Sequence, residues 1–230
     1  MKSAFTTATL TLGLAALVAT TSQSDAATIF EVGMVGTTAE TNNWPAAEPP
    51  PAAIDGANSK YLNFGELNTG FFVTPAAGPS VVTGLFLMTA NDAAPRDPLT
   101  FSLYGTNTQT ASGGAGTTFD LESGDFSPIT LNQSTGLEVD PGRLSTPAVQ
   151  PVIVNATEYT SYVLFFPTVR DPAAANSMQI SEAQLTGTVG GTPQTITAAG
   201  DPIVGGQVIP EPGTLSLLSL LGLAALRRRR

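Results

Sequence analysis

The sequence predicts an all-β protein whose core is a β-sandwich. Short runs rich in β-branched and aromatic residues recur between clusters of Gly, Pro, Asn and Asp, a spacing typical of sandwiches. Between residues 27 and 209 no run shows sustained helical periodicity, which argues against helical layers. The chain has no cysteine, so a packed core rather than disulfides must stabilise the domain.

The expected strands are runs in which apolar residues alternate with polar ones or continue without interruption. Phe101 and Leu103 alternate with Ser102 and Tyr104, as in a strand with one buried face. Residues 162–166 are apolar throughout, which indicates a central strand covered on both faces. The complete set of expected strands is residues 29–35, 70–74, 81–90, 99–105, 126–131, 149–154, 162–166 and 178–188.

Composition also predicts which segments lie outside the core. Residues 107–118 are rich in Thr, Ser and Gly, so we expect a flexible loop that buries little surface. The polar, Gly-rich residues 190–208 are expected to form a flexible spacer, which limits the β-sandwich domain to residues 27–189. About 160 residues suit a single domain with one core.

The C-terminal residues 209–230 have the composition of a sorting tail. Pro210, Glu211 and Pro212 precede an apolar run at 215–226, which is shorter than the roughly 20 residues that a membrane-spanning helix needs. The chain then ends in four arginines, which resist translocation and favour a cytoplasmic end: Arg227, Arg228, Arg229 and Arg230. The pattern predicts a short hydrophobic helix that anchors the chain transiently, with a permanent tail anchor as the alternative.

The N-terminal residues 1–26 have the pattern of a secretory signal peptide. Lys2 precedes an apolar stretch at residues 10–18, and Ser24-Asp25-Ala26 supplies a small-x-small cleavage pattern. The expected cut follows Ala26 or Ala27. Both ends of the chain therefore predict export.

The order and terminal position of the tail elements resemble the PEP-CTERM sorting signal of Gram-negative bacteria that make extracellular polysaccharide. This resemblance rests on Pro210-Glu211-Pro212, the apolar run and the arginine cluster. It implies recognition by an exosortase, a membrane protease, and cleavage near Glu211. The implied route is transient anchoring in the inner membrane, followed by transfer to the cell surface or extracellular matrix.

A second ordered series of segments occupies residues 53–56, 60–64, 70–71, 89–98, 103–107 and 175–182. This series, which covers residues 53–187, resembles a galactose-binding-like, discoidin-type domain. The resemblance implies an eight-stranded jelly roll. Residues 118–121 depart from the family, whose members often carry a tryptophan strand there.

The galactose-binding-like resemblance implies one structural calcium ion between an early loop and the last strand. Asp55 and Glu182 fall at the matching positions as side-chain ligands, with backbone oxygens expected from Asn58 and Lys60. Calcium prefers six to eight oxygen ligands, and a tight loop can present several carbonyls around one Asp. The alternative is that Asp55 only caps a turn and Glu182 is a surface carboxylate.

Four residues are candidates for binding a sugar: Trp44, Tyr61, Asn91 and Arg96. An aromatic ring could stack on the sugar while polar side chains contact hydroxyl groups. The structural alternatives are that Trp44 plugs one end of the barrel, that Lys60 and Tyr61 lie at the core edge, and that Arg96-Asp97 ties its loop to the sandwich by charge-assisted hydrogen bonds.

Charge and composition exclude several function classes. Residues 27–209 hold sixteen acidic residues against four basic ones, Lys60, Arg96, Arg143 and Arg170, so we expect no nucleic-acid partner. The absence of histidine and cysteine excludes Ser-His and Cys-His catalysis and the usual zinc sites. No carboxylate motif of a glycosidase is recognisable. The sequence therefore predicts a protein that is not an enzyme.

Two function classes remain open. The domain is expected to be a carbohydrate-binding module that holds extracellular polysaccharide, with a passive structural component of the surface or matrix as the alternative. An exposed aromatic ring beside a basin would favour sugar binding. A loop end lined only by small residues such as Ala, Thr and Gly would favour the structural role.

Overall fold

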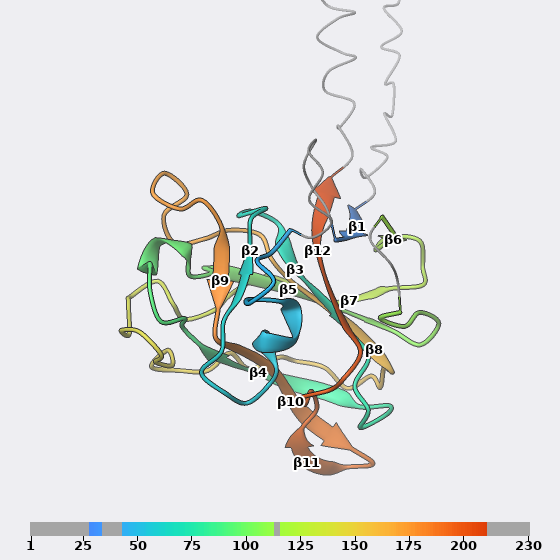
Figure 1. The fold of residues 1–230 in the computed structure, drawn as a ribbon. Coiled ribbons are helices and arrows are strands. Elements are labelled where there is room, and N and C mark those ends of the chain that lie inside the picture. The colour runs from blue at the N-terminus through green and yellow to red at the C-terminus, as the bar shows by residue number, and fades with distance from the viewer. Residues whose placement is uncertain (1–27, 34–42, 113–115, 211–230) are drawn as a thin grey trace, which may run out of the picture.

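The computed structural model describes residues 28–33, 43–112 and 116–210, which form antiparallel β-sheets (Figure 1). Two short 3-10 helices, η1 (Pro50–Ala53) and η2 (Ala94–Arg96), lie in loops of this part of the chain. None of the described helices is long and apolar enough to span a membrane. The strands are β1 (Thr28–Val32), β2 (Tyr61–Asn63), β3 (Thr69–Val73), β4 (Val81–Met88), β5 (Thr100–Thr106), β6 (Thr118–Asp120), β7 (Ser127–Ser134), β8 (Ser161–Phe166), β9 (Met178–Ile180), β10 (Glu182–Val189), β11 (Thr192–Thr195) and β12 (Ile203–Pro210).

The strands form one large sheet and two smaller ones. The large sheet has the order β6-β1-β12-β3-β8-β5-β7, and the smaller sheets have the orders β11-β10-β4 and β2-β9. The central strands of the large sheet come from distant parts of the sequence. Strands β1 and β3 are joined in this sheet only by the C-terminal strand β12, which pairs with both. The all-β class predicted from the sequence is confirmed.

Strand β8 shows why the large sheet is buried on both faces. Tyr162, Leu164 and Phe166 point into a main core cluster that β4, β9 and β10 also supply. Val163 and Phe165 point to the opposite face, where a second cluster of largely aromatic side chains covers them. Since successive strand residues face opposite sides, the apolar run at residues 162–166 is a central strand, as predicted.

Most of the predicted strands are present with small shifts at their ends. Residues 70–74, 81–90, 99–105 and 162–166 correspond to β3, β4, β5 and β8. The segment at residues 178–188 divides into β9 and β10, with Ser181 between them. The strands at residues 29–35 and 126–131 correspond to β1 and β7, although residues 34 and 35 lie outside the described part.

The strand predicted at residues 149–154 is wrong. These residues contribute an isolated bridge between Val152 and Gly84, and Gln150 bonds through its side chain to both backbone groups of Leu87. Val149, Val152 and Val154 are exposed. The run of Val and Ile therefore belongs to a segment that lies along β4 and makes only a few of the hydrogen bonds of a ladder.

The flexible spacer predicted at residues 190–208 is also wrong, because β11 and most of β12 lie there. Gly205 and Gly206 suggested a linker, but both are required by close packing. A Cβ atom on Gly205 would lie 2.6 Å from the Trp44 ring, and one on Gly206 would meet the Phe30 ring and the Glu31 carbonyl. The described domain therefore extends through Pro210 rather than ending at residue 189.

Two further features escaped prediction: the shortest strands and the packing of one loop. Strands β2, β6 and β11 are three or four residues long, too short to give a pattern. The loop at residues 107–118 contributes to the core, since Ala111 is buried in the second cluster and its N–H donates to the Thr74 hydroxyl at 2.8 Å. The signal helix at residues 1–26 and the hydrophobic helix of the tail lie outside the described residues.

Candidate functional site

The structure brings Asp55 and Glu182 together. Asp55 follows η1 and begins a tight turn, in which its Oδ1 accepts a hydrogen bond from the Ala57 N–H at 2.8 Å. Glu182 is the first residue of β10 and is 2% exposed. The turn lies over the start of β10, where the Gln184 side chain also approaches Gly56.

The Glu182 carboxylate is buried and only partly compensated by neighbouring groups. Neither of its oxygens has a hydrogen-bond partner among the described residues. Burial raises the pKa of Glu182 to about 8, and the adjacent Asp55 carboxyl acts in the same direction. The N–H groups of Ala57 and Gly56 oppose this rise in the pKa only partly. The described residues therefore stabilise the charged form of Glu182 poorly.

A divalent cation would stabilise the charged form of the Glu182 carboxylate. Two neighbouring carboxylates, one with both oxygens orphaned, form an oxygen-donor set that calcium prefers. Among the described residues, no three His, Cys, Asp or Glu side chains converge on one point, so the other ligands would have to be carbonyl or water oxygens. The alternative that Glu182 is a surface carboxylate is wrong, because its side chain is buried.

The two expected backbone ligands lie in the same loop, but the Lys60 side chain has other partners. Asn58 is exposed. The Lys60 ammonium pairs with Glu48 at 3.0 Å and with Asp92 at 3.3 Å. These ion pairs hold the end of the loop against two neighbouring segments.

A surface depression of about 370 Å³ lies beside Asp55. It contains no aromatic side chain and no cation. Its walls are formed almost entirely by small or cyclic side chains: Ala46, Ala47, Pro49, Pro51, Ala52, Asp55, Ser59, Ala199 and Gly200. Such a surface offers nothing on which a sugar ring could stack.

The two aromatic candidates for sugar binding are built into the core. Tyr61 is fully buried, and its hydroxyl donates to the Gly70 carbonyl at 2.9 Å and accepts from Asn63 Nδ2 at 2.8 Å. Trp44 is half-buried, with its ring edge-on to Tyr61 at a centroid distance of 6.4 Å. The Tyr61 prediction is therefore wrong, and Trp44 plugs the space over Gly205.

The two polar candidates lie in the loop between β4 and β5. Asn91 is exposed, and Arg96 is half-buried as the last residue of η2. The loop that contains them is held by Gln179, whose Nε2 donates to the carbonyl oxygens of Asp92 and Ala93 at 2.6 and 3.2 Å. The four expected sugar contacts do not act together, because Tyr61 is fully buried and closed to a ligand.

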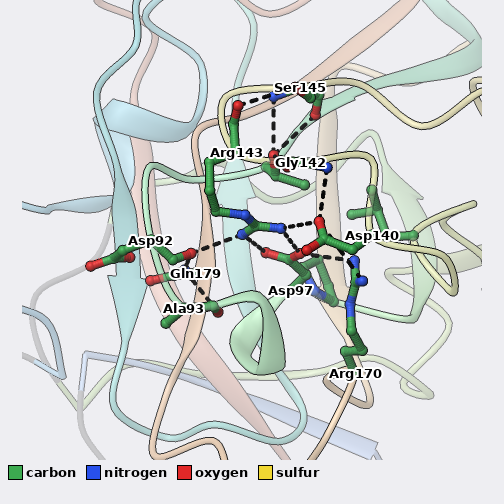
Figure 2. Close-up of polar contacts among 12 residues, drawn as sticks. Asp92, Ala93, Asp97, Asp140, Gly142, Arg143, Ser145, Arg170 and Gln179 are labelled. Carbon is green, nitrogen blue, oxygen red and sulfur yellow. Dashed lines mark hydrogen bonds and ion pairs between the residues drawn. The ribbon is translucent and has the colours of Figure 1, made fainter.

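Asp97 ties the same loop to the domain, as predicted, but through partners other than Arg96. It is fully buried and receives two hydrogen bonds from Arg143 and one from Arg170 (Figure 2). Arg143 also pairs with Asp140 at 2.6 Å and donates to the Asp92 carbonyl at 2.8 Å. Three separate segments therefore meet at one buried carboxylate.

Sequence reasoning missed this cluster of Asp97, Asp140, Arg143 and Arg170. One signal was present, since the described residues hold only four cations against a large acidic excess. Three of the four are engaged in ion pairs. Scarce cations in an acidic chain are good candidates for buried partners of carboxylates.

Of the expected sorting motif, the structure describes Pro210 at the end of β12. Glu211, Pro212 and the four terminal arginines lie outside the described residues. No protein-family model matches the chain, and no curated protein matches it.

Proposed function

We propose that this chain is an exported, non-catalytic surface or matrix protein whose β-domain has a structural role. The observation that carries this proposal is the composition of the depression beside Asp55, which is lined by small residues and has no aromatic ring. The burial of Tyr61 and the packing of Trp44 agree with it. Carbohydrate binding remains the alternative, supported by the exposed Asn91 and the half-buried Arg96 on one loop.

The ends of the sequence support export and sorting. Residues 1–26 have the pattern of a signal peptide, and residues 209–230 resemble a PEP-CTERM tail that an exosortase-type protease would cut near Glu211. On this proposal the protein is anchored transiently in the inner membrane and then reaches the cell surface or matrix.

The antiparallel domain is proposed to be a galactose-binding-like jelly roll with one structural calcium ion. Asp55 and Glu182 would supply carboxylate oxygens, and Asn58 and Lys60 would supply backbone oxygens. When bound, calcium supplies the positive charge that the buried Glu182 carboxylate lacks. The ion would thereby join the loop after η1 to the start of β10.

Two measurements on the protein purified from the producing cells test this function. Binding to the organism's own extracellular polysaccharide is measured with and without calcium, and we expect no saturable binding. Saturable binding that a free sugar displaces and that Arg96→Ala weakens would favour the carbohydrate-binding alternative. Mass spectrometry of the surface protein should find a C-terminus near Glu211, and an intact Arg230 would contradict sorting.

A further inference from the structure

The first and last described strands bring both expected processing sites to one place. In the β1–β12 ladder Thr28 lies opposite Pro210, and the ends of these strands are adjacent in Figure 1. The expected signal-peptide cut, after Ala26 or Ala27, immediately precedes Thr28. The expected tail cut, near Glu211, immediately follows Pro210.

Hydrogen bonds hold the chain up to Thr28 on one side and up to Val208 on the other. The Thr28 carbonyl accepts from the Leu121 N–H at 2.8 Å, and its hydroxyl donates to Glu122 at 3.0 Å. On β12, the Val208 N–H donates to the Asn68 carbonyl at 2.7 Å, and Gln207 Nε2 donates to the Leu67 carbonyl at 2.8 Å. Both strands are therefore fixed almost to the expected cuts.

The position of β12 between two other strands means that it can leave the sheet only if both of its strand pairings break. Strand β12 pairs with β1 on one side and β3 on the other, so β1 and β6 reach the rest of the sheet only through β12. A protease needs an exposed, locally unfolded segment. A cut within residues 203–209 would require β12 to leave the sheet, whereas a cut after Pro210 requires no opening of the ladder.

We infer that the β1–β12 pair is a proteolytic boundary that confines trimming of both ends to the residues just outside Thr28 and Pro210. This inference rests on the proposed export and sorting, and it specifies how the fold regulates the sorting cut. The folded sheet protects residues 203–209, so the mature domain keeps β12. Both trimmed ends then lie together at one edge of the domain.

The test is native-state digestion of the purified full chain with proteinase K, followed by mass spectrometry of the resistant fragment. We expect the fragment to begin at residues 26–28 and to end at residues 210–212. Cuts within residues 203–209 while the rest stays intact would overturn the inference. In hydrogen exchange, β12 should be protected like β3, and exchange as fast as that of the fully exposed β11 would equally overturn it.

A variant provides the converse test. Gly206→Val places a side chain against the Phe30 ring and the Glu31 carbonyl, so β12 should separate from β1 and be cut within residues 203–209 at least about tenfold faster. Thr192→Val replaces a hydroxyl with a methyl group on exposed β11 and should leave the boundary unchanged. If Gly206→Val does not fold, the wild-type digestion and exchange still decide. An intact Arg230 in producing cells would contradict sorting but not the boundary.

Discussion

Arg143 donates two hydrogen bonds to Asp97, from Nη1 to Oδ1 at 2.8 Å and from Nη2 to Oδ2 at 2.6 Å. This paired geometry gives a charge-assisted contact its greatest strength and directional selectivity. Arg170 adds a third hydrogen bond to the same carboxylate at 2.9 Å. Asp97 therefore fixes the loops that carry Arg143 and Arg170 with respect to its own loop (Figure 2).

Replacing Asp97 with Asn should lower the free energy of unfolding by about 3–5 kcal/mol, because two arginines would lose the buried charge that they pair with. Urea-induced unfolding, monitored by circular dichroism, measures the loss. Asp140→Asn is the matched control: this carboxylate is exposed, so its removal should cost much less. Equal effects of the two substitutions would contradict the central role of Asp97.

Glu182→Gln should remove the response to calcium. In wild-type protein we expect calcium to raise the melting temperature, since it would bind the folded state through Asp55 and Glu182. The variant keeps the shape of the side chain but loses a ligand charge, so calcium should leave its melting temperature unchanged. Glu158→Gln, at an exposed site, should respond like wild type. A full calcium response in Glu182→Gln would exclude Glu182 as a ligand.

Without calcium, stability should fall as pH rises from about 4.5 to about 8. The pKa of Glu182 is raised to about 8 in the folded protein from an ordinary value of 4.5. In this pH range the unfolded chain has lost the proton that the folded protein still holds, so deprotonation favours unfolding. Denaturant unfolding in EDTA at a series of pH values measures this fall. Glu182→Gln should show a smaller fall, and identical profiles would contradict the prediction.

Gly70→Ala should destabilise the large sheet by about 1–3 kcal/mol or more, because a Cβ atom there would collide with the backbone of Leu164 and Phe165 on β8. Chemical denaturation measures the change. Gly84→Ala is the control, since its nearest neighbour is the movable Thr186 hydroxyl at 2.7 Å. Gly70→Ala should therefore cost more, and a smaller cost than that of Gly84→Ala would show that β3 and β8 can separate without penalty.

The sequence by itself determined the all-β class and the strands with strong local patterns. Residues 162–166 are a clear case, because a continuous apolar run can be satisfied only where both faces are covered. The strand pattern follows from side-chain type and order alone. Asp55 and Glu182 were singled out by the galactose-binding-like resemblance, and the structure brings them together.

Only the tertiary structure decided the role of β12 and of the buried ion pairs. Gly205 and Gly206 suggest a linker in isolation, but their small size is needed where Trp44 and Phe30 pack against the strand. The partners of Asp97 come from two distant segments, which no local pattern joins. Long-range pairing depends on which surfaces meet after folding, so it is not encoded in residue spacing.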